Sequence, residues 1–309
     1  MKINFAFFGT SDFSVVVLNE LKKTGWLPTL IITAPDKPKG RGLKLTPLPV
    51  KLWALANKID FIQPEKLDSN LCYKLQVTSY KIFVVASYGK IIPREILDIP
   101  EHGALNVHPS LLPKYRGASP IQAQILNDEK NIGVTIMLMD EKMDHGPVLA
   151  NREFPPDFCL QKSRILDFDL SKSGQFPNNM ELSKRLAKEG GELLAETLPK
   201  WLAGKIKPIP QDDGRATFCQ KISKEDGLID LNANSRQNFL KIQAFAGWPG
   251  TYFFVERKGK KTRVKITKAS FTDGKLKIES VIPEGKKEIS WKEFSRFLFN
   301  DDKTVAAIA

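Results

Sequence analysis

The chain has 309 residues, of which 42% are hydrophobic, and it carries a formal net charge of +12. This length predicts two domains with cores of their own, and this composition excludes a disordered or a collagen-like chain. The cysteines Cys72, Cys159 and Cys219 form no Cys-x-x-Cys pair, so we expect neither a disulfide framework nor a zinc site. This cysteine content is typical of a reducing compartment, and we therefore expect a cytoplasmic protein. With no signal-peptide pattern and no apolar stretch of roughly 18 residues, we also expect no contact with a membrane.

Apolar and amphipathic segments alternate through residues 1–204. The apolar runs predict strands at Ile3–Phe8, Leu30–Thr33, Phe61–Ile62, Ile82–Ala86, Ala104–Val107 and Val134–Leu138. The amphipathic segments predict helices from Ser11 or Asp12 to Lys23, and at Val50–Lys58, Leu71–Thr78, Pro120–Leu126 and Met180–Leu202. This alternation predicts an α/β fold with a mostly parallel, Rossmann-like sheet and helices on both faces. Ligands of such sheets bind beyond the carboxyl ends of the strands.

Three segments of this half are less regular. Residues 35–47 are rich in Pro, Gly and Lys and are expected to form a loop. Gly190 and Gly191 are a candidate interruption of the long helix that ends near Leu202. Residues 158–177 follow no pattern from which a fold or a role can be inferred.

A polar segment rich in Pro, Asp and Gly, 205–214, predicts a linker between a domain at 1–204 and a second domain at 215–309. The second domain is expected to hold a helix at Ser235–Phe245 and strands at Gly250–Glu256, Thr262–Phe271 and Lys275–Val281, in a small β-barrel. Residues 204–309 hold 21 Lys and Arg against 13 Asp and Glu, which favours a polyanionic partner such as nucleic acid. A soluble, lysine-rich surface is the alternative. We expect Tyr252, Phe253 and Phe254 to be core aromatics, with base stacking as the second interpretation.

The candidate catalytic residues are Asn106, His108 and Asp144. Asn106 and His108 alternate at the end of a predicted strand, so both side chains can face one pocket. An amide and a protonated imidazole can stabilise the oxyanion that forms when an amine attacks an acyl carbonyl. The Asp144 carboxylate can accept the proton that the amine releases. In the structural alternative, His108 packs beneath Pro109 and Asp144 caps a turn.

Other chemistries lack their motifs. The first strand is followed by Gly9–Phe13, which lacks the glycine triplet of a dinucleotide site. The chain has no Gly-x4-Gly-Lys phosphate loop and no Gly-x-Ser-x-Gly elbow around a nucleophilic serine. Its three histidines form no paired ligand motif, so we expect no metal.

Residues Leu105–Gly117 read LNVHPSLLPKYRG, and this run resembles the signature of the 10-formyltetrahydrofolate-dependent formyltransferases. The likeness extends over Phe5–Phe13, Ser87–Pro93 and Thr135–Asp144, and over 221–225 and 248–249 in the second domain. The resemblance implies that Asn106, His108 and Asp144 are catalytic. It also implies that the formyl donor is held by Ser110, Leu111, Leu112 and Pro113, with Tyr88 and Gly89 nearby.

Within this family, segment 35–47 resembles the insertion of the members that formylate initiator methionyl-tRNA. The resemblance implies that Arg41 contacts the acceptor stem, with Lys37, Lys39 and Lys44 beside it, and that an OB-like C-terminal barrel holds the tRNA. We therefore expect initiator methionyl-tRNA and a folate co-substrate as partners, and a monomer. His145 departs from the family, which often has a small residue after the aspartate.

Three alternatives remain at this point. An amino-sugar formyltransferase would need neither a basic loop nor a basic second domain. A non-catalytic RNA-binding protein with an inactive formyltransferase domain is the second, and a nucleotide-dependent dehydrogenase is the third.

Overall fold

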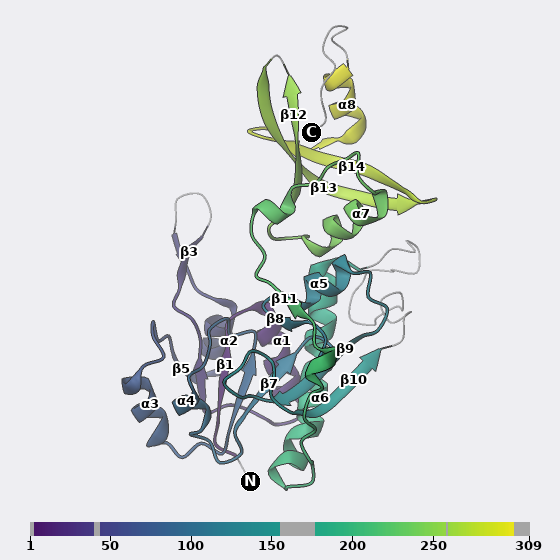
Figure 1. Cartoon of the computed structure of the whole chain (residues 1–309). Helices are drawn as coiled ribbons and strands as arrows, with labels where there is room; N and C mark the ends of the chain where they lie inside the picture. The colour runs from purple at the N-terminus through teal and green to yellow at the C-terminus, as the bar shows by residue number, and fades with distance from the viewer. Residues whose placement is uncertain (1–2, 40–43, 155–176, 258, 300–309) are drawn as a thin grey trace. The chain divides into compact units, whose positions relative to one another are not determined.

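The computed structural model describes residues 3–39, 44–154, 177–257 and 259–299 (Figure 1). Its contacts divide the chain into two compact units. The first contains Met1–Pro120, Asn131–Phe154 and Ser183–Cys219. Of the described residues, the second contains Ile121–Lys130, 177–182 and the chain from Gln220 onward. The boundaries expected from the sequence, 1–204, 205–214 and 215–309, stay a prediction.

The first unit is built on a seven-stranded sheet. Its spatial order is β10 (Val148–Phe154), β9 (Ile132–Leu138), β7 (Ala104–His108), β6 (Ile82–Ala86), β1 (Phe5–Gly9), β2 (Leu30–Ile32) and β5 (Asp60–Ile62). The strands from β7 to β5 are parallel, whereas β9 is antiparallel to β7 and β10 is antiparallel to β9. The expected α/β class and mostly parallel sheet are confirmed, with a reversal at one edge.

One face of this sheet packs against α3 (Ser69–Gln76) and α4 (Arg94–Leu97). Alternate strand residues such as Phe8 and Phe83 point to this side, because successive side chains of a strand face opposite ways. They form a buried cluster with Leu75 of α3 and Ile96 of α4. This cluster is the core beneath that face of the sheet.

The other face is covered by α1 (Asp12–Lys23) and α6 (Asn179–Leu202), and α2 (Pro49–Asn57) contacts α1. The expected interruption at Gly190 and Gly191 is wrong, since α6 is continuous. A Cβ at Gly190 would lie 2.6 Å from Val107 Cγ1, and one at Gly191 would lie 2.8 Å from Glu20 Cβ. These glycines let α6 approach the sheet and α1 closely, and that packing outweighs their low helix propensity.

Two small sheets lie in the same unit. β3 (Lys37–Lys39) and β4 (Lys44–Thr46) form an antiparallel hairpin in the segment that the sequence predicts to be a loop. β8 (Arg116–Gly117) pairs in parallel with β11 (Phe218–Cys219), which follows a 3-10 turn at Asp213–Arg215.

The second unit contains an antiparallel sheet of β12 (Thr251–Arg257), β13 (Lys260–Thr272), β14 (Lys275–Pro283) and β15 (Ile289–Ser290). Its helices are α5 (Pro120–Leu126), α7 (Ser235–Ala244) and α8 (Trp291–Phe299), with a 3-10 turn at Glu225–Gly227. Inward residues of the sheet, including Phe253 and Val264, pack with Phe294 of α8 in a buried cluster. The three strands and the helix expected here are confirmed.

Across the described ranges, none of the helices combines the length and the apolar character that a bilayer crossing requires.

Candidate active site

The structure brings Asn106, His108 and Asp144 together. Asn106 and His108 lie at the carboxyl end of β7, which is held between β6 and β9 near the middle of the sheet. Asn106 Nδ2 lies 3.4 Å from Asp144 Oδ1, and His108 Nδ1 lies 3.7 Å from the same oxygen. One carboxylate oxygen therefore faces both the amide and the imidazole.

Asp144 occupies the loop that joins β9 to β10. Its φ of +49° lies in the left-handed region, which a residue with a Cβ seldom adopts. Asp144 Oδ2 accepts a hydrogen bond of 2.8 Å from the Gly117 N–H, which leaves Oδ1 directed at Asn106 and His108. The Asp144 side chain is 16% exposed, so a substrate amine can reach a carboxylate whose orientation is fixed.

His108 is buried, and its ring has one defined orientation. Nε2 lies 3.0 Å from the carbonyl oxygen of Tyr115, which can only accept, so Nε2 carries a proton. Nδ1 therefore faces Asp144 either as an unprotonated acceptor or, once it gains a second proton, as a donor. The ring can take up a proton on the side where the reaction is expected and become an imidazolium next to a carboxylate.

The expected donor-binding segment, Ser110–Pro113, is tied to β9 by one threonine. Thr135 Oγ1 donates to the Ser110 carbonyl at 2.7 Å and accepts from the Leu112 N–H at 3.1 Å. Ser110 Oγ donates to the carbonyl of Lys114 at 2.7 Å. These bonds fix the backbone that follows His108, so the segment offers a rigid wall beside the candidate catalytic residues.

Tyr88 and Gly89 follow β6, the strand next to β7. The Tyr88 ring is 3% exposed and packs edge-on against Phe8, with 5.4 Å between the ring centroids. Burial raises the pKa of its hydroxyl to about 12. The structure thus places this ring in the core, while Gly89, with a φ of +77°, turns the chain away from the strand end. Their part in donor binding stays a prediction.

The basic hairpin β3–β4 carries the residues expected to contact tRNA. Arg41 falls outside the described residues, Lys37 is exposed in β3, and the Cα atoms of Lys39 and Lys44 are partners in the register of the two strands. Asp36, at the base, accepts bonds of 2.5 Å from Lys51 Nζ and 2.8 Å from Gln63 Nε2. These partners, the Lys51 ammonium first, hold the pKa of Asp36 below its usual value. The one anion of the segment is thus neutralised at the point where the hairpin leaves the sheet.

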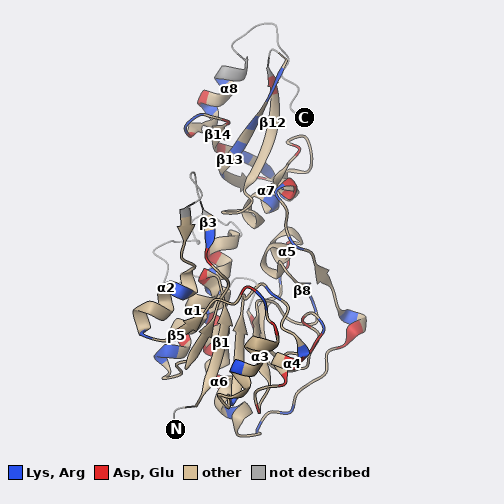
Figure 2. Ribbon diagram, turned by 90° about the vertical axis from the view of Figure 1, so that its left-hand side faces the viewer, with Lys and Arg blue, Asp and Glu red and all other residues tan. Residues whose placement is uncertain are grey.

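A second basic surface lies on the outer face of β12 and β13 in the second unit, where Figure 2 shows Lys and Arg along the strands. The Arg263 guanidinium lies 4.7 Å from the centre of the Tyr252 ring, and Lys261 Nζ lies 4.5 Å from that of Phe254. Phe253 is buried, as expected, but Tyr252 and Phe254 are half-buried on the opposite face. We call these four residues, Tyr252, Phe254, Lys261 and Arg263, the cation–aromatic face.

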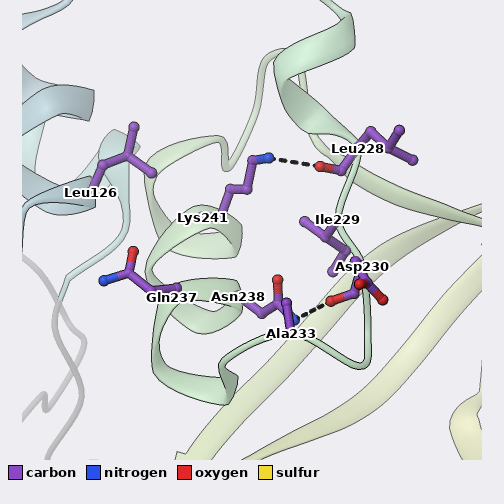
Figure 3. A pocket seen from close by; sticks show the side chains of 8 residues that line it. All are labelled: Leu126, Leu228, Ile229, Asp230, Ala233, Gln237, Asn238 and Lys241. Atoms are coloured by element: carbon purple, nitrogen blue, oxygen red, sulfur yellow. Dashed lines mark hydrogen bonds between the residues drawn. The ribbon is translucent and has the colours of Figure 1, made fainter. Parts of the chain in front are cut away.

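A cavity of about 580 Å³ is also confined to the second unit (Figure 3). Figure 3 shows Lys241 of α7 directed at the carbonyl of Leu228, a hydrogen bond of 2.7 Å, and Asn238 directed at that of Asp230, at 2.6 Å. Burial lowers the pKa of Lys241. These two polar groups are therefore bonded to the walls of the cavity, and none of its lining residues belongs to the site around Asp144.

Gln211, which supports the loop that carries Asp144, was not among the candidate site residues inferred from the sequence. Gln211, assigned to the linker, bonds the backbone on both sides of His145 and also Arg116. His145 lies between two carboxylates, with Nδ1 2.6 Å from Asp140 Oδ2 and Nε2 3.4 Å from Asp213 Oδ2. No local pattern could have revealed the contacts of Gln211, because they join residues 65 to 95 positions apart.

No group of three or more His, Cys, Asp or Glu residues in the described ranges is arranged to hold a metal ion.

Comparison with family models matches residues 1–159 to the formyl transferase family and residues 221–275 to the C-terminal domain of formyl transferases. A methionyl-tRNA formyltransferase from Thermodesulfovibrio yellowstonii is 38% identical, over 95% of this chain and 96% of its own length. One from Listeria monocytogenes is 40% identical over 87% of this chain and 80% of its own.

Solved structures show the same fold at lower identity. A sugar N-formyltransferase from a Shewanella species superposes with a TM-score of 0.61 at 17% identity, over 88% of this chain and 99% of its own. A methionyl-tRNA formyltransferase from Clostridium thermocellum superposes with a TM-score of 0.56 at 17% identity, over 93% of this chain and 99% of its own. At these identities the likeness concerns the fold alone and does not separate a sugar from a tRNA as acceptor.

Proposed function

Because this chain belongs to the formyl transferase family, and within it to the methionyl-tRNA formyltransferases, we propose that Asn106, His108 and Asp144 transfer a formyl group to initiator methionyl-tRNA. The donor is 10-formyltetrahydrofolate and the acceptor is the methionyl α-amino group. One observation carries the proposal: the amide of Asn106 and the imidazole of His108 both face Asp144 Oδ1 at the end of β7.

The reaction begins with the neutral amine. A free α-amino group has a pKa of about 8, so a useful fraction is unprotonated at neutral pH. As its nitrogen attacks the formyl carbon, negative charge develops on the carbonyl oxygen. The Asn106 N–H and a protonated His108 Nδ1 are the donors that stabilise this oxyanion.

The proton of the attacking amine passes to Asp144, directly or through a water molecule. The bond between the formyl carbon and N10 of the folate then breaks, and N10 receives a proton from the His108 and Asp144 pair. The products are N-formylmethionyl-tRNA and tetrahydrofolate, and the site returns to its starting protonation state.

The acceptor is inferred from charge. The basic hairpin and the cation–aromatic face present positive charge for a phosphate backbone, and Tyr252 and Phe254 add surfaces on which bases can stack. A nucleotide amino sugar needs neither surface. These features support tRNA as the acceptor.

The proposal is tested by supplying formyl-labelled 10-formyltetrahydrofolate together with charged initiator tRNA, and in parallel with a nucleotide amino sugar. Label should appear on the methionyl amine and not on the sugar. Label on the sugar alone would identify a sugar formyltransferase, and label on neither would leave the site without the proposed activity.

Substitution of Arg41 by leucine is expected to raise the tRNA concentration needed for half-maximal rate and to leave folate binding unchanged. The reason is the loss of a guanidinium that can bond phosphate or base edges bidentately. The matched control is Arg94→Leu, which removes an exposed arginine paired with Asp98 at 2.6 Å on the same unit. An unchanged tRNA dependence in the Arg41 variant would remove the hairpin from the proposal.

Substitution of Lys261 and Arg263 by glutamine should make tRNA binding less sensitive to salt. In a plot of the logarithm of the tRNA association constant against the logarithm of salt concentration, each lost phosphate contact reduces the steepness of the negative slope by about 0.9 or less. Lys268→Gln is the control, because Lys268 on the same strand is held by Glu279 at 2.8 Å. A slope equal to that of wild type would show that the cation–aromatic face does not contact the tRNA.

A further inference from the structure

Gln211 uses the whole of its amide group within the first unit. Its Nε2 donates to the carbonyl of Asp144 at 2.9 Å and to that of Gly146 at 2.7 Å. Its Oε1 accepts from Arg116 Nε at 3.0 Å. Both N–H groups and the oxygen are therefore bonded to segments that border the candidate active site.

The loop held by Gln211 adopts a conformation that requires support. A residue with a Cβ seldom adopts the left-handed region, and Asp144 is in that region. At Gly146 the chain passes so close to β9 that a Cβ would lie 1.9 Å from the Leu138 carbonyl oxygen. The two bonds from Gln211 fix the loop on both sides of His145 and oppose relaxation of the Asp144 backbone.

The third bond of Gln211 leads to the segment that orients the carboxylate. Arg116 is 3% exposed, and its Nη2 is paired with Asp213 Oδ1 at 2.8 Å. The next residue, Gly117, donates its N–H to Asp144 Oδ2. Gln211 thus connects the backbone of Asp144 with the element that holds the Asp144 side chain.

Arg116 is fixed in turn by the chain around Gln211. The backbone N–H of Arg116 donates to the Thr217 carbonyl at 2.8 Å, and the strand β8, which contains Arg116, pairs with β11. The Arg116 guanidinium holds the pKa of Asp213 below its usual value, so this carboxylate stays ionised and keeps its partner. The segment from Gln211 to Cys219 is a support for the catalytic loop.

From these contacts we infer that Gln211 is a positioning residue, which acts on the reaction through Asp144 without touching the substrate. The inference rests on the proposed function, because it takes Asp144 as the proton acceptor. A misplacement of about 1 Å in a reacting group can cost about 100-fold in rate. Loss of the Gln211 bonds is therefore expected to appear in kcat.

Two variants separate the bonds of Gln211 from its volume. Gln211→Met fills a similar space and makes none of the three bonds, while Gln211→Glu keeps the acceptor for Arg116 and loses both donors to the loop. Gln220→Met is the matched control, because Gln220 is an exposed glutamine of the following segment. Both Gln211 variants should lose about 100-fold in kcat with the KM for each substrate unchanged, and the control should match wild type.

The decisive readout is the effect of Gln211→Met in an Asp144→Asn background. If Gln211 acts through the Asp144 carboxylate, the second substitution should lower the residual rate by less than about threefold, because residues that act as a unit are not additive. A full loss of about 100-fold in both backgrounds, or an unchanged kcat in the single variants, would overturn the inference. A wild-type protein that formylates no methionyl-tRNA would instead refute the proposed function.

Discussion

Replacement of Asp144 by asparagine is expected to lower kcat for formyl transfer by about 100- to 10,000-fold, the range for loss of a positioned proton acceptor. Asparagine has the same shape, and its side-chain oxygen can still accept from the Gly117 N–H. It cannot take the proton from the attacking amine. The measurement is a single-turnover rate with saturating donor and charged tRNA.

Affinity provides the internal check on this result. The tRNA concentration for half-maximal rate should not change, because the proposed function assigns Asp144 to the chemical step and tRNA binding to the basic surfaces. Glu141→Gln is the matched control, since Glu141 is an exposed carboxylate in the same loop. A variant at Asp144 that loses tRNA affinity and keeps its rate once saturated would argue against this division of roles.

Replacement of His108 by alanine is expected to reduce kcat by about 100- to 1,000-fold, the usual effect of removing one donor to an oxyanion. The variant removes the ring nitrogen that lies opposite Asp144 and the hydrogen bond from Nε2 to the Tyr115 carbonyl. Because His108 is 3% exposed, alanine also creates a cavity that lowers the melting temperature.

A second variant separates chemistry from stability. His108→Gln fills more of the space and offers an amide that cannot become cationic, so its melting temperature should recover while its kcat stays low. His102→Gln serves as the control, because His102 is a partly exposed histidine whose nearest charged partner, Glu101, lies 3.7 Å away. Recovery of the rate in His108→Gln would show that the imidazolium is not needed.

Local pattern predicted much of the site and of the fold. Successive side chains of a strand alternate, which places Asn106 and His108 on the same side, and Pro109 marks the end of that strand. A pair of polar side chains at the carboxyl end of a strand in a parallel sheet could therefore be inferred. Because β9 is antiparallel to β7, it ends opposite Leu105 and away from His108. The meeting of the pair with Asp144 therefore depends on the path of the loop that follows β9, which no local signal in the sequence specifies.

The remaining differences have one physical cause. The polar composition of 205–214 is typical of an exposed linker, which stays a prediction, yet Gln211 is half-buried because its amide bonds the loop around Asp144 and the buried Arg116. Gly190 weakens a helix in isolation, but in α6 it allows close contact with Val107. In each case a long-range contact outweighs the local preference from which the prediction was made.

His108 and Asp144 are proposed to act as a unit, because the Asp144 carboxylate faces the imidazole that becomes cationic and the pair returns a proton to N10. The most direct test is the single-turnover rate of formyl transfer in the double variant Asp144→Asn/His108→Gln, compared with each single variant and with wild type. The double variant is expected to be about as slow as the slower single variant, because either loss disables the pair. A double variant whose loss equals the product of the two single losses would contradict this proposal.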